Sequence, residues 1–169
     1  MTWVYLHLAI NHFPVVLTLL GTVAVLASLW WRRAAREAWR YGLVTLVLAT
    51  ASAVPAWITG NQSHEVVEKR LGVKEGVVEA HELVAEGTLW VIVAMGGLGG
   101  FALWRGHREG TLGPAPDWVR WSVVAAAVAG SAMLGWTALL GGKITHGSEA
   151  SAALRPDSAL TLTAPSQGP

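Results

Sequence analysis

The sequence contains no cysteine, and only 14% of its 169 residues are charged. Without cysteine, the chain cannot form disulfides, thiolate metal sites, cysteine-ligated iron–sulfur clusters or the covalent attachment of a c-type haem. An average soluble domain has about 25% charged residues. Here 53% of the residues are hydrophobic, 19 more are glycine, and the mean hydropathy is +0.44. This composition excludes an ordinary soluble globule and favours a membrane protein. The net charge of +1 gives no reason to expect nucleic-acid binding.

Four stretches of the chain contain no Asp, Glu, Lys or Arg, namely residues 1–31, 41–64, 87–104 and 121–142. A helix needs about 20 mostly apolar residues to cross the core of a bilayer. The apolar runs also lack the period-2 alternation that is typical of membrane β-barrels. We therefore predict an all-α integral membrane protein, a four-helix bundle with helices over about 3–31, 41–60, 81–104 and 121–142.

The other segments are shorter or more polar. Residues 61–80 mix valine and leucine with charged residues, which predicts an amphipathic segment on the outer surface. Residues 148–169 are rich in Ser, Ala and Pro, and we expect a flexible tail there. The transmembrane domain is therefore expected to be one unit over residues 1–147.

Basic residues are concentrated in two short loops. Segments 32–40 and 105–120 hold seven arginines in 25 residues, whereas segments 65–86 and 143–169 hold five Lys or Arg in 49 residues. The positive-inside rule then predicts arginine-rich loops in the cytoplasm and both termini on the outer, periplasmic side. No basic cluster precedes the first helix, so we expect it to be retained rather than cleaved as a signal peptide. The expected location is the inner (cytoplasmic) membrane, as a multi-pass protein.

Tryptophan and glycine positions add two expectations. Indole rings are enriched at membrane interfaces, so we expect most of the ten tryptophans to be interfacial anchors. Six of them gather at the predicted cytoplasmic ends: Trp30, Trp31, Trp39, Trp104, Trp118 and Trp121. Gly96 and Gly100 have the four-residue spacing that is typical of close helix packing, whereas Ser131, Gly135, Gly141 and Gly142 are expected to line a cofactor.

Five of the six histidines fall at a similar predicted depth, and only His107 belongs to the opposite side. A helix rises about 1.5 Å per residue, which puts the five within roughly 10 Å of one another along the membrane normal. They come from all four helix ends: His7, His12, His64, His81 and His146. Ionisable groups at this level are costly unless paired, and imidazole is a common ligand of metals and haem iron. The alternative is that each is an interfacial residue with a satisfied ring.

Residues around the first histidines refine this expectation. Asn11 lies four residues after His7 and could orient its imidazole. His7 and His12 are about 140° apart around a helix, so we do not expect them to bind one ligand together. Pro14 lacks a backbone N–H, which predicts a kink near the start of the first span.

Several of these segments together resemble the DUF2231 family (domain of unknown function 2231) of predicted bacterial membrane proteins. The matching pieces cover most of residues 1–147: residues 7–14 with their His…His-Phe-Pro pattern, residues 30–32, His81, and residues 135–147 with Gly-Gly…His-Gly. Family members usually show His-Pro where this chain has His7-Leu8. The resemblance implies a helical membrane fold, and His7, His12, His81 and His146 match recurring family positions. Related domains occur beside Rieske-type iron–sulfur modules, which implies a redox setting.

Three functions remain open. The first, which we prefer, is a redox subunit that binds b-type haem through His7, His12, His81 and His146, with His12 and His81 as the best axial pair. It would pass electrons within a respiratory-type complex of partner subunits, with a quinol as a candidate donor. The second is a non-haem copper, zinc or iron site built from the five clustered histidines with Glu82 or Glu86, although these carboxylates could also form a solvated helix start. The third is a structural accessory subunit without cofactor. The Gly-x-Ser-x-Gly and His-Glu-x-x-His motifs of hydrolases are absent.

Overall fold

The computed structural model describes residues 2–71, 75–110 and 115–153. For residues 2, 64–71, 75 and 145–153 it describes the backbone but not the side chains. This part of the chain consists of helices without any strand: α1 (Thr2–Ile10), α2 (His12–Trp30), α3 (Ala35–Leu71), α4 (Glu75–Arg108) and α5 (Asp117–Ala153). Helices α1 and α2 together form one span, so four segments are long and apolar enough to cross a membrane. The predicted all-α four-helix membrane bundle is confirmed.

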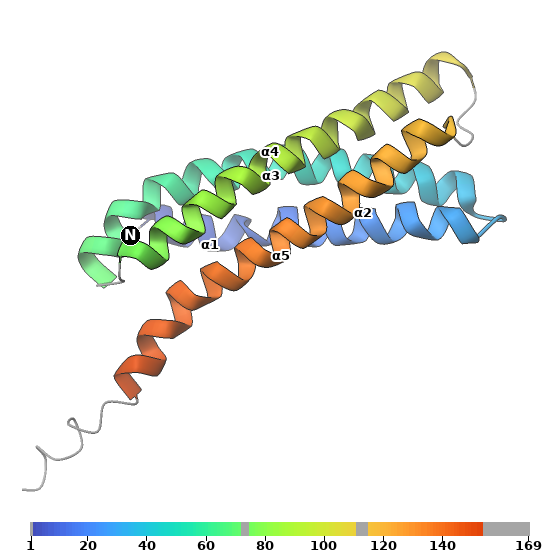
Figure 1. Ribbon diagram of the computed structural model, residues 1–169. Helices are drawn as coiled ribbons and strands as arrows, with labels where there is room; N and C mark the ends of the chain where they lie inside the picture. Colours follow the sequence, from blue (N-terminus) through green and yellow to red (C-terminus); the bar gives the residue numbers. More distant parts are fainter. Residues whose placement is uncertain (1, 72–74, 111–114, 154–169) are drawn as a thin grey trace, which may run out of the picture.

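The spans run up and down in chain order around the bundle (Figure 1). Helix α2 packs against α3, α3 against α4, and α4 against α5, while α5 also contacts α2 and closes the ring. Helix α1 packs against α3. The start of α1 and the last turns of α5 lie toward the same end, where α5 runs away from the other helices (Figure 1). Both ends of the described chain therefore lie on one side of the membrane, and the periplasmic side stays a prediction.

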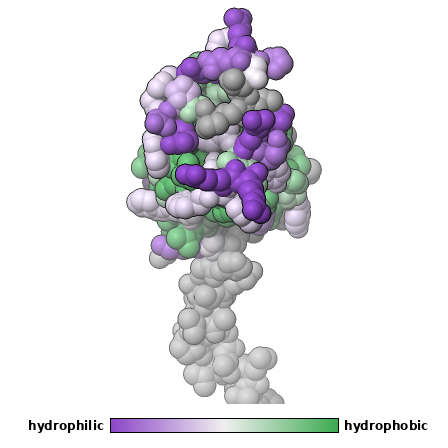
Figure 2. Space-filling view, turned by 90° about the vertical axis from the view of Figure 1, so that its right-hand side faces the viewer, coloured by the Kyte–Doolittle hydropathy of each residue, from purple (hydrophilic) through white to green (hydrophobic). Residues whose placement is uncertain are grey.

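The two ends of the bundle differ in charge. The arginine end, which we define by residues 30–40 and 104–121, carries the α2–α3 and α4–α5 connections. Figure 2 looks at this end and shows hydrophilic side chains around it. The opposite end holds His7 and His81 and is called the histidine end below.

The first span is broken at Asn11, between α1 and α2, where the sequence predicts a kink. Pro14 lies in the first turn of α2 and has no N–H to donate back to Ile10. Asn11 keeps helical dihedral angles (φ −63°, ψ −21°), and its N–H still donates to the carbonyl of His7 over 2.9 Å. The break is therefore local.

Three helices extend beyond their predicted bounds. Residues 61–71 continue α3 and residues 75–80 begin α4, so the predicted surface segment 61–80 is divided between two long helices. The predicted bounds followed the uncharged runs, but Glu, Lys, Arg and Ala are strong helix formers that prolong a helix past the apolar region. Residues 148–153 likewise continue α5, and the rest of the predicted tail, 154–169, lies outside the described residues.

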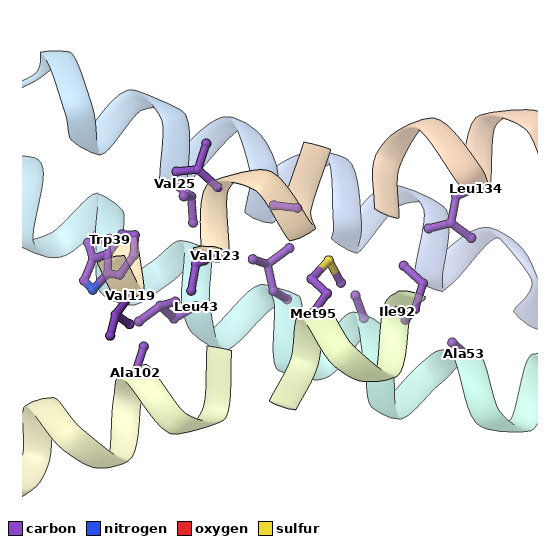
Figure 3. Packing of buried hydrophobic residues seen from close by; sticks show 14 residues of the cluster. Val25, Trp39, Leu43, Ala53, Ile92, Met95, Ala102, Val119, Val123 and Leu134 are labelled. Atoms are coloured by element: carbon purple, nitrogen blue, oxygen red, sulfur yellow. The ribbon is translucent and has the colours of Figure 1, made fainter. Parts of the chain in front are cut away.

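The apolar core runs along the middle of the bundle, from Trp39 and Val119 to Ala53 and Leu134 (Figure 3). Its largest fully buried apolar side chains are Leu43, Leu46, Ile92, Met95, Val25, Val119 and Val123. Trp39 belongs to this core with only 5% of its surface exposed, near Val119 and Ala102 (Figure 3). Trp39 is thus an exception to the expectation that most tryptophans are interfacial anchors, because its ring points into the bundle. The other nine tryptophans are at least 38% exposed.

Glycines permit the closest helix contacts. On α2 and α3, a Cβ at Gly21 would lie 2.7 Å from Leu46 Cδ2, and one at Gly42 would lie 2.7 Å from Val25 Cγ2. On α4, a Cβ at Gly96 would overlap the Thr50 side chain of α3. The predicted packing role of Gly96 is thus confirmed, whereas a Cβ at Gly100 would have nothing within 4 Å.

Hydroxyl groups link three of the helix interfaces. Thr50 donates to the carbonyl of Ile92 over 2.8 Å between α3 and α4. The Thr88 and Thr137 hydroxyls are 2.8 Å apart between α4 and α5, and those of Thr22 and Ser131 are 3.0 Å apart between α2 and α5. Such hydrogen bonds hold helices together inside a bilayer, where water does not compete for the donors. They fix the ring of helices that brings the histidine end together.

Candidate functional site

His7 projects from α1 onto α3. Its Nδ1 atom donates to the backbone carbonyl of Ala56 over 2.9 Å and lies 3.3 Å from the Thr59 hydroxyl. The ring covers Gly60, where a Cβ would lie 3.1 Å from His7 Cε1. A carbonyl can only accept, so Nδ1 carries the proton and the lone pair of the neutral ring lies on Nε2.

His81 lies on α5 in a closely similar way. A Cβ at Gly141 would come within 3.3 Å of His81 Cε1 and 3.7 Å of its Nδ1. The carbonyl of Thr137, four residues before Gly141, interacts with the ring. Nδ1 itself is buried without a hydrogen bond of normal geometry. The contact of His81 with Thr137 is therefore looser than the hydrogen bond of His7 with Ala56. Ala56 lies four residues before Gly60, just as Thr137 lies four residues before Gly141.

His7 and His81 form a candidate pair at the histidine end. Both rings are partly buried, and the helices that carry them both pack against α3. Each ring rests on a glycine of the adjacent helix, and each faces a carbonyl one helical turn before that glycine. Gly141 thus contacts the predicted cofactor ligand His81, its own predicted role of lining a cofactor stays a prediction, and the role of Gly60 was not predicted. A side chain at either glycine would push the ring away from its carbonyl.

Neither His12 nor His107 joins this pair. His12 is exposed, and its Nδ1 bonds the carbonyl of Leu8 on its own turn over 3.0 Å. The structure therefore does not support His12 with His81 as the axial pair, because His12 faces out of the bundle while His7 faces in. His107 lies in the last turn of α4 at the arginine end. The predicted ligands His64 and His146 lie on α3 and α5, but their side chains are outside the description.

Asn11 does not orient His7 as predicted. The Ala56 carbonyl and the Thr59 hydroxyl occupy Nδ1 of His7, and the Oδ1 atom of Asn11 is buried without a hydrogen-bond partner in the described structure. A buried oxygen of this kind costs free energy unless a donor reaches it. Of the other residues expected to line a cofactor, Ser131 bonds Thr22 and Gly135 is exposed.

The two predicted carboxylate ligands line a separate open groove between α3 and α4. The groove has a volume of about 330 Å³ and is formed by Trp57 and Asn61 of α3 with Glu82 and Glu86 of α4. Glu82 follows His81 directly and interacts with it electrostatically. The groove therefore lies beside the histidine pair and presents an aromatic ring, an amide and two carboxylates.

The donor set limits which cofactors the site can hold. Among the side chains that the structure describes, no three His, Cys, Asp or Glu residues gather closely enough to bind a metal ion. Structural or catalytic zinc usually needs at least three protein ligands. A haem iron is held mainly by its porphyrin and needs only two axial side chains. His7 and His81 are thus candidates for two such axial side chains, while the side chains of His64 and His146 lie outside the described part of the chain.

Scans against protein-family models, curated proteins and solved structures returned no match to this chain.

Proposed function

We propose that this protein is a membrane redox subunit that binds a b-type haem through His7 and His81 near the histidine end of the bundle. The observation that carries the proposal is the similar seating of two part-buried imidazoles, His7 of α1 against Gly60 of α3 and His81 of α4 against Gly141 of α5. A haem would supply one-electron transfer between its ferrous and ferric states. The side chains would hold it and tune its potential.

The hydrogen bonding of His7 supports a ligand role. Haem-ligating and metal-ligating histidines usually donate their second ring N–H to a carbonyl or carboxylate, which fixes the tautomer and the plane of the ring. The Nδ1–H of His7 donates to Ala56 in this manner and leaves Nε2 free to coordinate. His81 has the same kind of carbonyl within reach at Thr137.

The surroundings support a place in an electron-transfer chain. The groove of Trp57, Asn61, Glu82 and Glu86 adjoins His81. An aromatic ring can stack on a quinol head group, and carboxylates can accept the protons that a quinol releases when it is oxidised. We therefore propose a quinol as electron donor, partner subunits as acceptors, and the inner membrane as location, with the histidine end on the periplasmic side as the arginine distribution predicts.

The test is a reduced-minus-oxidised absorbance spectrum of the full chain, purified in detergent from cells supplied with haem. We expect low-spin haem bands and about one haem per chain in the wild type. His7→Ala and His81→Ala should each reduce bound haem at least ~10-fold, on the scale seen when a ligand or its support is lost. His12→Ala is the matched control, because His12 is exposed and bonds only its own helix.

Other outcomes would replace the proposal. Wild-type protein without haem bands, even after incubation with haemin, would overturn it. Metal analysis of the same dialysed sample would then separate the two alternatives. One equivalent of copper, zinc or iron would favour a bare-metal site that recruits His64 or His146, and no metal would favour the accessory subunit.

A further inference from the structure

The arginine end carries an aromatic and basic surface that the proposed redox role does not use. Phe101, Trp104 and Arg108 lie on one face of α4, since they are spaced by three and four residues. Trp118 in the first turn of α5 faces them, with its ring 6.2 Å from that of Phe101. The rings of Phe101 and Trp104 are 6.0 Å apart and tilted by 34°. We call these four residues the α4–α5 ledge.

The ledge is exposed although it is largely apolar. Phe101, Trp104 and Trp118 are 39%, 54% and 60% exposed, and they lie where two membrane spans end. Aromatic rings at this depth usually meet the boundary between acyl chains and head groups. The glycerol region and upper chains of a lipid are therefore the natural cover for the three rings.

The charge on the ledge selects the head group. The guanidinium of Arg108 stacks over the Trp104 ring at 5.1 Å, which leaves its N–H edge free to donate. Arg105, on the same helix turn, is already paired with Glu109 at 2.7 Å. In the described structure no carboxylate is paired with Arg108. The arginine end as a whole has seven arginines against three carboxylates (Arg32, Arg33, Arg36, Arg40, Arg105, Arg108 and Arg120 against Glu37, Glu109 and Asp117).

We infer that the α4–α5 ledge is a binding site for one anionic phospholipid of the leaflet at the arginine end. Arg108 donates to the lipid phosphate in the forked geometry that guanidinium offers to phosphate. Trp104 holds the guanidinium in place and, with Phe101 and Trp118, covers the upper acyl chain. A zwitterionic lipid would share the apolar contacts but bring an ammonium group toward the arginine-rich end, so it should bind less tightly.

The experiment is native mass spectrometry of the delipidated full chain in detergent, titrated with phosphatidylglycerol or phosphatidylcholine of equal chain length. We expect wild-type protein to retain one phosphatidylglycerol in preference to phosphatidylcholine. Arg108→Gln should lower phosphatidylglycerol retention about five-fold, the effect of one arginine near an anionic surface. Trp104→Leu should reduce the same preference. Arg33→Gln, which removes one exposed arginine from the same end without touching the ledge, should change retention less than about two-fold.

Two results would overturn the inference. Equal losses for Arg108→Gln and Arg33→Gln would mean that only the diffuse charge of the arginine end attracts anionic lipid. Displacement of the lipid by millimolar inorganic phosphate would mean that a phosphate site exists without the aromatic contacts. Circular dichroism of each variant checks the fold, which exposed substitutions of this kind should change little.

Discussion

Neighbouring glycines on α4 offer a sharp test of the helix packing. Gly96 and Gly97 are consecutive, and the same substitution to alanine can be made at each. A Cβ at Gly96 would overlap the Thr50 hydroxyl and lie 2.6 Å from Thr50 Cβ, whereas a Cβ at Gly97 would have nothing within 4 Å. The two variants therefore differ almost entirely in what the added methyl group meets.

The expected magnitude follows from the Thr50 contacts. Carbon atoms pack best at about 3.5–4.0 Å, and Thr50 Cβ is fixed to the backbone of α3, so the two helices must separate by about 1 Å. Overpacking of this kind costs about 1–3 kcal/mol. The separation also weakens the 2.8 Å hydrogen bond from Thr50 to Ile92, worth about 0.6–1.7 kcal/mol in a membrane protein. Because alanine also gains up to about 1 kcal/mol of helix propensity, Gly96→Ala should lower the free energy of unfolding by about 1–4 kcal/mol.

Gly97→Ala should leave stability unchanged or raise it by up to about 1 kcal/mol, because alanine is the better helix former. The assay is equilibrium unfolding in mixed micelles by titration with sodium dodecyl sulfate, followed by far-ultraviolet circular dichroism. If both variants unfolded at the same detergent fraction, α3 and α4 would not be in close contact at Gly96, and the described interface would be incorrect.

Three further predictions concern the site and its support. Gly60→Ala should weaken haem retention about 2–10-fold, because the new Cβ lies 3.1 Å from the His7 ring and loosens a hydrogen bond worth about 0.5–1.5 kcal/mol; unaltered retention in a haem titration would contradict this. His7 should be the Nδ1–H tautomer in protein without haem, which ¹⁵N-histidine NMR measures directly, and an Nε2–H form would remove the proposed Ala56 contact. Thr22→Val should lower the free energy of unfolding by about 0.6–1.7 kcal/mol, since it removes the link to Ser131 between α2 and α5; in a Ser131→Ala background the same change should have a smaller effect.

The membrane spans could be predicted from the sequence because they depend only on the order of apolar and charged residues along the chain. A charged residue inside a bilayer is costly, so the uncharged runs mark the spans without any knowledge of packing. Pro14 similarly predicts a local break because its missing N–H acts on its own helix. Helix ends beyond the apolar runs, such as residues 61–71 of α3, could not be placed this way, since a helix continues in water as readily as in lipid when its residues favour it.

The identity of the paired histidines could not be predicted, because it depends on how each helix is rotated about its axis. His7 and His12 lie at similar depth, and only their positions around the helix separate the inward ring from the outward one. That rotation is fixed by contacts between distant segments, for example Gly21 with the α3 helix at Gly42. Gly60 carried no motif that marked it, since a single glycine near a helix end has many uses.

The uneven distribution of apolar packing has a consequence for how the bundle opens. The largest fully buried apolar side chains lie between Val119 and Ile92, whereas the apolar residues buried toward His7 and His81 are mostly small, such as Ala53, Ala56 and Val78. Regions held by few apolar contacts open at a lower free energy than the rest of a protein. The histidine end should therefore separate transiently while the arginine end stays folded, which would give the proposed haem a route into the bundle without unfolding the whole chain.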